Sequence, residues 1–161
     1  MGPIAFTVRH DSVLDRLITP CGICPAFDPT CGLPHPEVVQ FNALWDTGAT
    51  NSAISPKVVA ALGIRPYTMT KVFHAQGEST TGVYLVNIFL PNNVAFQSLR
   101  VSEGILNGCD VLIGMDIISH GDFSITHKSK GTVFSFQIPS THEYDFVKQI
   151  GHTHPAIKKK R

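Results

Sequence analysis

The sequence predicts a mostly β fold with two short helices, and three observations support this. Short runs rich in Val, Ile, Phe and Tyr recur along the chain, turn-forming Gly, Pro and Asn residues separate them, and only two segments carry helix start and stop signals. The chain has 161 residues, of which 43% are hydrophobic and 16% charged. This length and composition are typical of one globular domain with a sizeable core.

The first part of the chain contains two predicted strands with a long connection between them. Residues 4–9 alternate between apolar and polar, and residues 38–45 form a more apolar run, which is typical of a buried strand. The stretch at about 10–37 holds five prolines, and a connection of this length is uncommon unless it is functional, cross-linked or disordered. We interpret it as an irregular, Cys- and Pro-rich insertion.

The middle of the chain predicts a short helix followed by hairpins. Ser55 is a suitable N-cap, Pro56 suits the first helical position, and Gly63 suits the position after the last turn. Turn-forming residues at 76–79 and 91–93 then separate β-rich runs. These predicted strands lie at 67–73, 83–90 and 94–101.

The last part of the chain predicts a buried strand at 109–114 and a short helix at 115–121 that Gly121 ends. A hairpin follows, with strands at 123–125 and 132–138. We therefore place the domain at residues 1–140. Residues 141–161 lose the strand pattern and end in four basic residues, so we expect a C-terminal basic tail of uncertain order without a role in the chemistry.

Charge and hydropathy argue against several classes of function. The formal net charge is +1, which does not favour broad electrostatic binding of nucleic acid. No apolar run approaches the roughly 20 residues that a membrane span needs. Three of the four cysteines are crowded at Cys21, Cys24 and Cys31, unlike a disulfide framework. We expect a soluble, cytoplasmic protein that binds neither nucleic acid nor membrane.

The segment Asp46-Thr47-Gly48 offers a reactive carboxylate on a tight turn, and this motif occurs once in the sequence. Two carboxylates about 3 Å apart cannot both ionise readily, so such a pair holds one proton and can act as general base and general acid together. If water activation needs two carboxylates, the second must come from another copy of the chain. Asp110 and Asp116 flank the apolar run Val111-Leu112-Ile113 and Gly114. We expect Asp110 to be a strand-edge charge and Asp116 a carboxylate in a first helical turn.

From about residue 38 to 138, the chain resembles the retropepsin-like aspartic proteases, which include retroviral proteases and the protease domain of DNA-damage-inducible ubiquitin shuttle proteins. The resemblance rests on an ordered set of motifs rather than on one turn. They are Asp46-Thr47-Gly48-Ala49-Thr50, Ile54-Ser55-Pro56, Ala75-Gln76-Gly77 with Gly82, and Val111-Leu112-Ile113-Gly114-Met115-Asp116.

This resemblance implies a closed β-barrel-like acid protease fold, a homodimer with one Asp46 from each subunit, and a flap hairpin that covers the peptide. It implies catalysis by Asp46 and support of the active site by Thr47, Gly48 and Ala49. It further implies substrate contacts at Gly48, Thr50, Asn51, Gln76 and Gly77. Ala49 has no hydroxyl to donate to the carboxylates, so we expect an activity optimum at weakly acidic to near-neutral pH.

We therefore predict an aspartic endopeptidase that acts as a homodimer on a peptide or protein substrate and needs no cofactor. The alternatives are an inactive retropepsin-like module for dimerisation or peptide binding, and an adaptor stabilised by zinc. Cys21, Cys24, Cys31 and His35 supply the number and type of ligands that tetrahedral zinc takes, although this spacing matches no zinc module closely. Unliganded thiols or a Cys21–Cys24 redox pair are the other interpretations.

Overall fold

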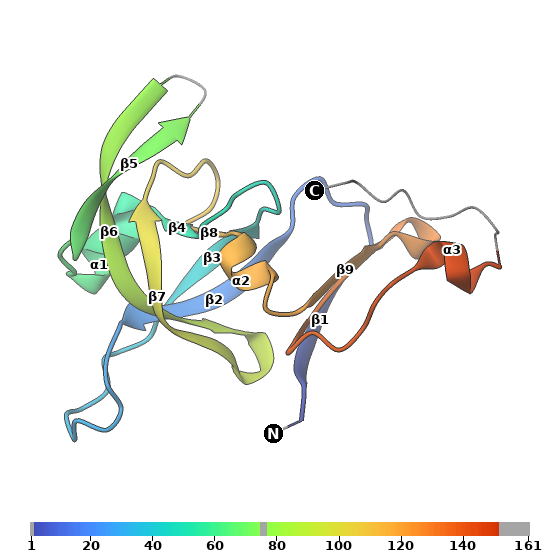
Figure 1. Ribbon diagram of the computed structural model, residues 1–161, viewed down its shortest axis with the longest axis horizontal. Helices are drawn as coiled ribbons and strands as arrows, with labels where there is room; N and C mark the ends of the chain where they lie inside the picture. Colours follow the sequence, from blue (N-terminus) through green and yellow to red (C-terminus); the bar gives the residue numbers. More distant parts are fainter. Residues whose placement is uncertain (1, 75–76, 152–161) are drawn as a thin grey trace.

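A closed barrel forms the larger part of the computed structural model, which describes residues 2–74 and 77–151 (Figure 1). Six strands follow one another around the barrel, and pairing of the last with the first closes it. A further strand, β5 (Thr68–His74), pairs with β6 (Gly77–Leu90), and the two form a hairpin that extends from the barrel. In spatial order, the barrel strands are β2 (Ile18–Pro25), β3 (Val39–Trp45), β8 (Val111–Ile113), β4 (Ala53–Ile54), β7 (Val94–Glu103) and β6 (Gly77–Leu90). The mostly β, closed architecture predicted from the sequence is confirmed.

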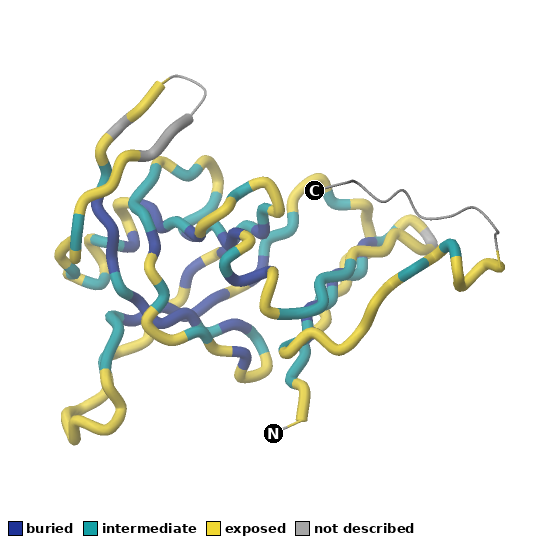
Figure 2. Tube along the Cα trace, viewed as in Figure 1, coloured by how far each residue is buried: buried dark blue, intermediate teal, exposed yellow. Residues whose placement is uncertain are grey.

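The barrel closes around a core to which strands such as β3 contribute alternate side chains. In β3, Phe41, Ala43 and Trp45 are buried while Asn42 is exposed, because successive side chains of a strand point to opposite faces. Figure 2 shows that buried residues concentrate in the centre of the barrel. The largest fully buried side chains of this core include Ile23, Ile54, Val86, Ile88, Val101, Val111 and Ile113.

The prediction of an irregular insertion at about 10–37 is wrong for Ile18–Pro25, because these residues form β2, a core strand of the barrel. Proline did not exclude a strand here because Pro20 lies where β2 pairs with β3 alone; β6 pairs only with Gly22–Pro25. A strand tolerates proline where one of its edges is unpaired.

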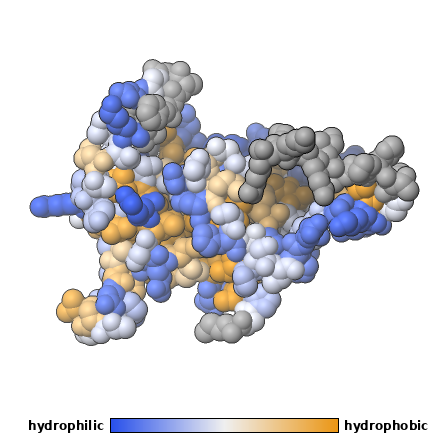
Figure 3. Space-filling view, viewed as in Figure 1, coloured by the Kyte–Doolittle hydropathy of each residue, from blue (hydrophilic) through white to orange (hydrophobic). Residues whose placement is uncertain are grey.

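Of the rest of the predicted insertion, residues 11–17 connect β1 to β2, and residues 26–38 form a loop that projects from the barrel and is mostly exposed (Figure 2). Its surface is partly apolar in the space-filling view (Figure 3), and the side chain of Leu33 is 70% exposed.

A second, three-stranded antiparallel sheet packs against the barrel. It consists of β1 (Ile4–His10), β10 (Thr132–Ile138) in the centre, and β9 (Asp122–Thr126), all at positions where the sequence predicts strands. The indole of Trp45 in β3 joins the two sheets: its ring centroid lies 4.9 Å from that of Phe134 and 5.0 Å from that of Phe136. The residue directly before Asp46 is therefore held by the aromatic core between the sheets.

The two predicted helices are present and short. Helix α1 (Pro56–Leu62) begins with proline and ends at Gly63, whose φ of 61° is the left-handed conformation that glycine adopts readily. Ser55 precedes α1, but its side chain makes no capping hydrogen bond. Helix α2 (Met115–Ile118) ends before the predicted Gly121. The 3-10 turns η1 (Pro91–Asn93) and η2 (Lys128–Lys130) join neighbouring strands. No helix in the part of the chain that the structure describes is long and apolar enough to cross a membrane.

The chain after β10 is held to the second sheet by Asp122. Its carboxylate accepts hydrogen bonds from the Ser140 hydroxyl at 2.5 Å, the Thr141 amide at 3.0 Å and the His142 amide at 3.1 Å. A short helix, α3 (Phe146–Gln149), follows. The predicted tail of uncertain order therefore begins with a tethered segment and a helical turn, whereas the basic end at 152–161 lies outside the described residues.

We expect Asp122→Asn to lower the free energy of unfolding at neutral pH. The hydrogen bond from Ser140, followed by that from the Thr141 amide, lowers the pKa of the Asp122 carboxyl. A lowered pKa stabilises the fold at pH values above the unfolded-state pKa of about 3.9, and this stabilisation is lost as pH falls toward the folded-state pKa. Urea unfolding of both proteins at a series of pH values should therefore show a difference that shrinks in acid. A difference independent of pH would contradict this assignment.

Candidate active site

Asp46 lies directly after β3, on a turn that its own side chain helps to form. The Gly48 amide donates a hydrogen bond to Asp46 Oδ1 at 2.8 Å, and the Ala49 amide donates to the Asp46 carbonyl at 3.2 Å. A Cβ on residue 48 would lie 3.1 Å from Asp46 Oδ1, so glycine permits this close approach. Asp46 is half-buried, whereas Thr47 and Gly48 are exposed. The carboxylate is thus oriented and lies beside main-chain atoms that a ligand can reach.

The motif at residues 111–116 packs against this turn. Strand β3 runs parallel to β8, with Trp45 opposite Ile113, and the Asp46 amide donates to the Ile113 carbonyl at 2.9 Å. Gly114 then passes directly under the turn, because a Cβ there would lie 2.9 Å from the Ala49 carbonyl oxygen. An isolated surface turn would also contain the bond between Gly48 and Asp46, but it would not need this contact between distant segments.

The start of α2 continues the contact. The Met115 amide donates to the Ala49 carbonyl at 2.8 Å, and the Asp116 amide donates to the Thr50 carbonyl at 3.1 Å. Thr50 and Asn51, two of the five predicted substrate contacts, are both exposed, while Ser52 beside them is fully buried. Sequence reasoning did not identify Ser52, since a serine after two polar residues resembles any other position in a polar loop.

The predicted flap is the β5–β6 hairpin, which projects in Figure 1 from the same upper end of the barrel as the turn after β3. Gly77, at the start of β6, has a φ of 127°, a conformation that favours glycine. Ala75 and Gln76 lie outside the described residues, so the predicted substrate contact of Gln76 stays a prediction.

The base of this hairpin is held by a buried phenol. The Tyr84 hydroxyl donates to Glu103 Oε2 at 2.7 Å, and burial, followed by the hydrogen bond and the charge of Glu103, raises the pKa of Tyr84 to about 12. Gly82 lies against this ring, since a Cβ on residue 82 would approach it to 3.0 Å. Gly82 therefore permits close packing at the base of the hairpin.

Comparison with protein families matches residues 37–120 to the family described as "gag-polyprotein putative aspartyl protease". The match spans just over half of the chain and includes both interlocking motifs. The chain belongs to this family. Comparison with curated proteins finds no match.

Two solved structures are similar to this member of the family. One is a retropepsin-like aspartic protease from Rickettsia conorii, with a TM-score of 0.55 and 12% sequence identity over 85% of this chain and 96% of that chain. The other is the protease of simian foamy virus (mac), with a TM-score of 0.43 and 16% identity over 64% of this chain and 92% of that chain. The first likeness shows that this chain has the retropepsin-like fold.

The predicted zinc ligands do not meet in the described part of this family member. Cys21 and Cys24 are buried in β2, three positions apart and therefore on opposite faces of the strand. Cys31 is exposed in the loop at 26–38, and the His35 ring packs against the Phe27 ring at a centroid distance of 4.6 Å, tilted by 39°. Among the residues described, no three His, Cys, Asp or Glu side chains are placed to hold a metal ion.

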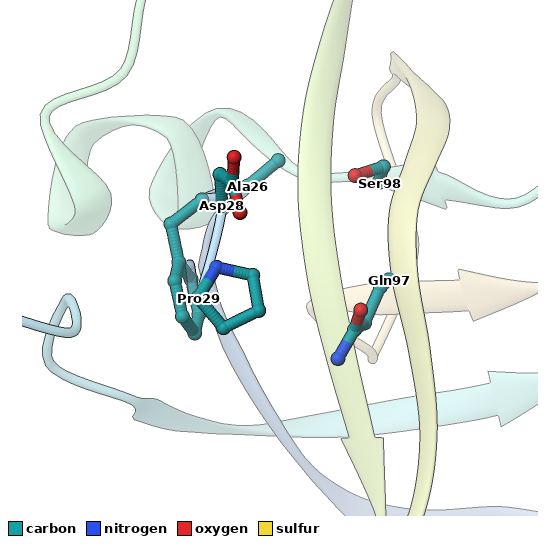
Figure 4. A pocket seen from close by; sticks show the side chains of 6 residues that line it. Ala26, Asp28, Pro29, Gln97 and Ser98 are labelled. Carbon is teal, nitrogen blue, oxygen red and sulfur yellow. The ribbon is translucent and has the colours of Figure 1, made fainter. Parts of the chain in front are cut away.

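A shallow hollow of about 370 Å³ lies between this loop and β7 (Figure 4). Its lining residues are Ala26, Phe27, Asp28, Pro29, Gln97 and Ser98. A β-bulge shapes it, because the β6–β7 register shifts between Val86 and Ile88 and Ser98 takes a φ of 53°. None of the predicted site residues lines this hollow.

The positions of the cysteines predict their reactivity. Burial, and to a lesser extent the charge of Asp110, raises the pKa of the Cys21 thiol to about 12, and burial also raises that of Cys24. The thiolate is the reactive form. In the native protein at about pH 8, iodoacetamide should therefore modify Cys31 well before Cys21 or Cys24, as peptide mass spectrometry would measure. Protection of Cys31 by added zinc, or a chelator-induced fall in Tm, would contradict the separation of these residues.

Proposed function

We propose that this chain is an aspartic endopeptidase that acts as a homodimer, each subunit contributing one Asp46. The observation that carries the proposal is the interlocked turn, in which the Gly48 amide orients the Asp46 carboxylate and after which the exposed Thr50 and Asn51 follow along the chain. The chain holds one Asp-Thr-Gly motif, so a pair of such carboxylates requires two chains. Membership of an aspartyl protease family supports the same reaction.

The proposed reaction needs no covalent intermediate. One carboxylate of the pair is ionised and removes a proton from water as that water attacks the peptide carbonyl, while the protonated partner donates its proton to the carbonyl oxygen. The tetrahedral intermediate then breaks its C–N bond: the dyad donates its proton to the departing amine nitrogen and takes one back from a hydroxyl of the intermediate as the carbonyl re-forms. The products are a carboxylic acid and an amine, and the pair again holds one proton.

The other predicted residues have supporting roles in this proposal. The carbonyl of Gly48 accepts a hydrogen bond from the bound peptide, and Thr50 and Asn51 flank that peptide. The exposed hydroxyl of Thr47 holds the turn of one subunit against that of the other. The hairpin with Gln76 and Gly77 closes over the substrate and excludes water. We propose no metal or cofactor for the reaction, and we place the enzyme in the cytoplasm on its cysteine content alone.

We expect Asp46→Asn to abolish peptide cleavage while leaving the Tm and the dimer unchanged. Asp28→Asn is a matched control, because Asp28 Oδ1 accepts from the amide two residues later, at Thr30, at the same 2.8 Å. Each protein would be incubated with a diverse peptide mixture, and the products identified by mass spectrometry. Cleavage by wild type and by Asp28→Asn, but not by Asp46→Asn, supports the proposal; cleavage that survives Asp46→Asn contradicts it. Absence of cleavage by all three proteins favours the inactive binding module.

Mixing subunits tests whether the dyad spans two chains. After exchange with an equal amount of Asp46→Asn protein, wild-type chains should keep about half of their activity, because half of them then sit in mixed dimers. The control mixture with Asp28→Asn should keep all of it. Unchanged activity in the first mixture, with exchange verified by native mass spectrometry, would show that one chain is sufficient.

The pH dependence of cleavage tests the role of Ala49. A side chain without a hydroxyl cannot donate to the dyad and so cannot favour its charged form. We therefore expect kcat/KM to peak at weakly acidic to near-neutral pH, and Ala49→Ser to shift the profile toward acid. A wild-type profile with its maximum in strong acid would contradict this.

A further inference from the structure

We infer that Asp116 is a positioning residue of the proposed active site, because its carboxylate fixes the segment that carries Thr50 and Asn51. The inference rests on the proposed function for its effect on peptide binding. It assigns a role to a carboxylate for which the sequence suggested only a favourable place in the first turn of a helix.

The Asp116 carboxylate binds Ser52 with both oxygens. Oδ2 accepts from the Ser52 amide at 2.9 Å, and Oδ1 accepts from the Ser52 hydroxyl at 2.7 Å. The Ser52 oxygen in turn accepts from the Gly114 amide at 3.1 Å. Ser52 is fully buried, so solvent does not replace these bonds, and the three residues form one closed network beneath the turn.

This network requires that both side-chain oxygens of residue 116 act as hydrogen-bond acceptors. The Ser52 oxygen accepts from Gly114, and its own proton needs an acceptor, which Asp116 Oδ1 supplies. An asparagine has one carbonyl oxygen and one NH2 group. If its oxygen kept the bond to the Ser52 amide, its NH2 group would face the hydroxyl and leave the hydroxyl proton without a partner in a buried place.

The network acts on the proposed substrate-binding segment more directly than on Asp46. The Asp46 amide donates a hydrogen bond to the Ile113 carbonyl, and the Asp46 carboxylate accepts one from the Gly48 amide. Neither hydrogen bond uses the Asp116 side chain. Ser52 lies between the exposed pair Thr50–Asn51 and β4, and the pairing of Ala53 with Leu112 holds β4 in place. A displaced Ser52 therefore moves Thr50 and Asn51 while leaving the catalytic carboxylate near its position.

We expect Asp116→Asn to raise KM for a cleaved peptide by about tenfold while changing kcat much less, because it removes binding that ground and transition states share. Ser52→Ala removes the same hydroxyl bond and should have a similar effect. The KM of the double variant should not exceed that of the more affected single variant, since the two residues act as one unit. Asp122→Asn is the matched control: it removes another hydrogen-bonded carboxylate, in the second sheet, and should leave KM unchanged.

Amide hydrogen exchange supplies a readout that does not depend on proteolysis. In Asp116→Asn, peptides covering residues 47–54 should exchange faster than in wild type, whereas in Asp122→Asn they should not. If wild type cleaves no peptide, the proposed function fails, and the exchange result still decides the positioning role. Unchanged exchange in this region, or a fall in kcat at constant KM, overturns the inference. If Asp116→Asn does not fold, Ser52→Ala decides by the same two measurements.

Discussion

The structure of the site depends on one close contact between two distant segments, the passage of Gly114 under the turn after β3. Parallel pairing of β3 with β8 brings the segments together, and the absence of a side chain at Gly114 lets the main chains approach. A Cβ at this position would lie 2.7 Å from the carbonyl carbon of Asn51. That distance is far below normal contact, so any other residue would push the turn away from β8. The same fit brings the Met115 and Asp116 amides within hydrogen-bond distance of the Ala49 and Thr50 carbonyls.

Below the turn, the same strand attaches the site to the rest of the protein. Trp45 points into the aromatic core between the barrel and the second sheet, and its Nε1 donates to the buried Thr19 hydroxyl at 2.9 Å. A large ring surrounded by Phe134 and Phe136 has little freedom to move, because protein interiors are closely packed. The floor of the site is therefore rigid. The hairpin above it, by contrast, extends beyond the barrel and is held at its base by Tyr84 and Glu103.

Sequence reasoning worked where the signal was local and missed features that depend on pairing between distant strands. The limits of α1 were predictable because Pro56 and Gly63 act through their own backbone conformations. Strand β2 was not, because its prolines argue against a strand until the arrangement of its neighbours shows that Pro20 lies where β2 pairs with β3 alone. The spacing of Cys21 and Cys24 resembled a metal site for a similar reason: spacing alone does not say that a strand turns these side chains to opposite faces.

The sequence by itself determined the mostly β fold, the retropepsin-like resemblance and the proposal of Asp46 as the catalytic residue. All three follow from hydrophobic patterns and from motifs whose order along the chain is visible. Only the tertiary structure decided that β2 belongs to the barrel, that Asp122 holds the chain after β10, and that Asp116 binds the buried Ser52. These features join residues that the chain brings together only on folding. A carboxylate in a sequence does not show which hydrogen-bond donors will surround it, because burial and long-range pairing select its partners.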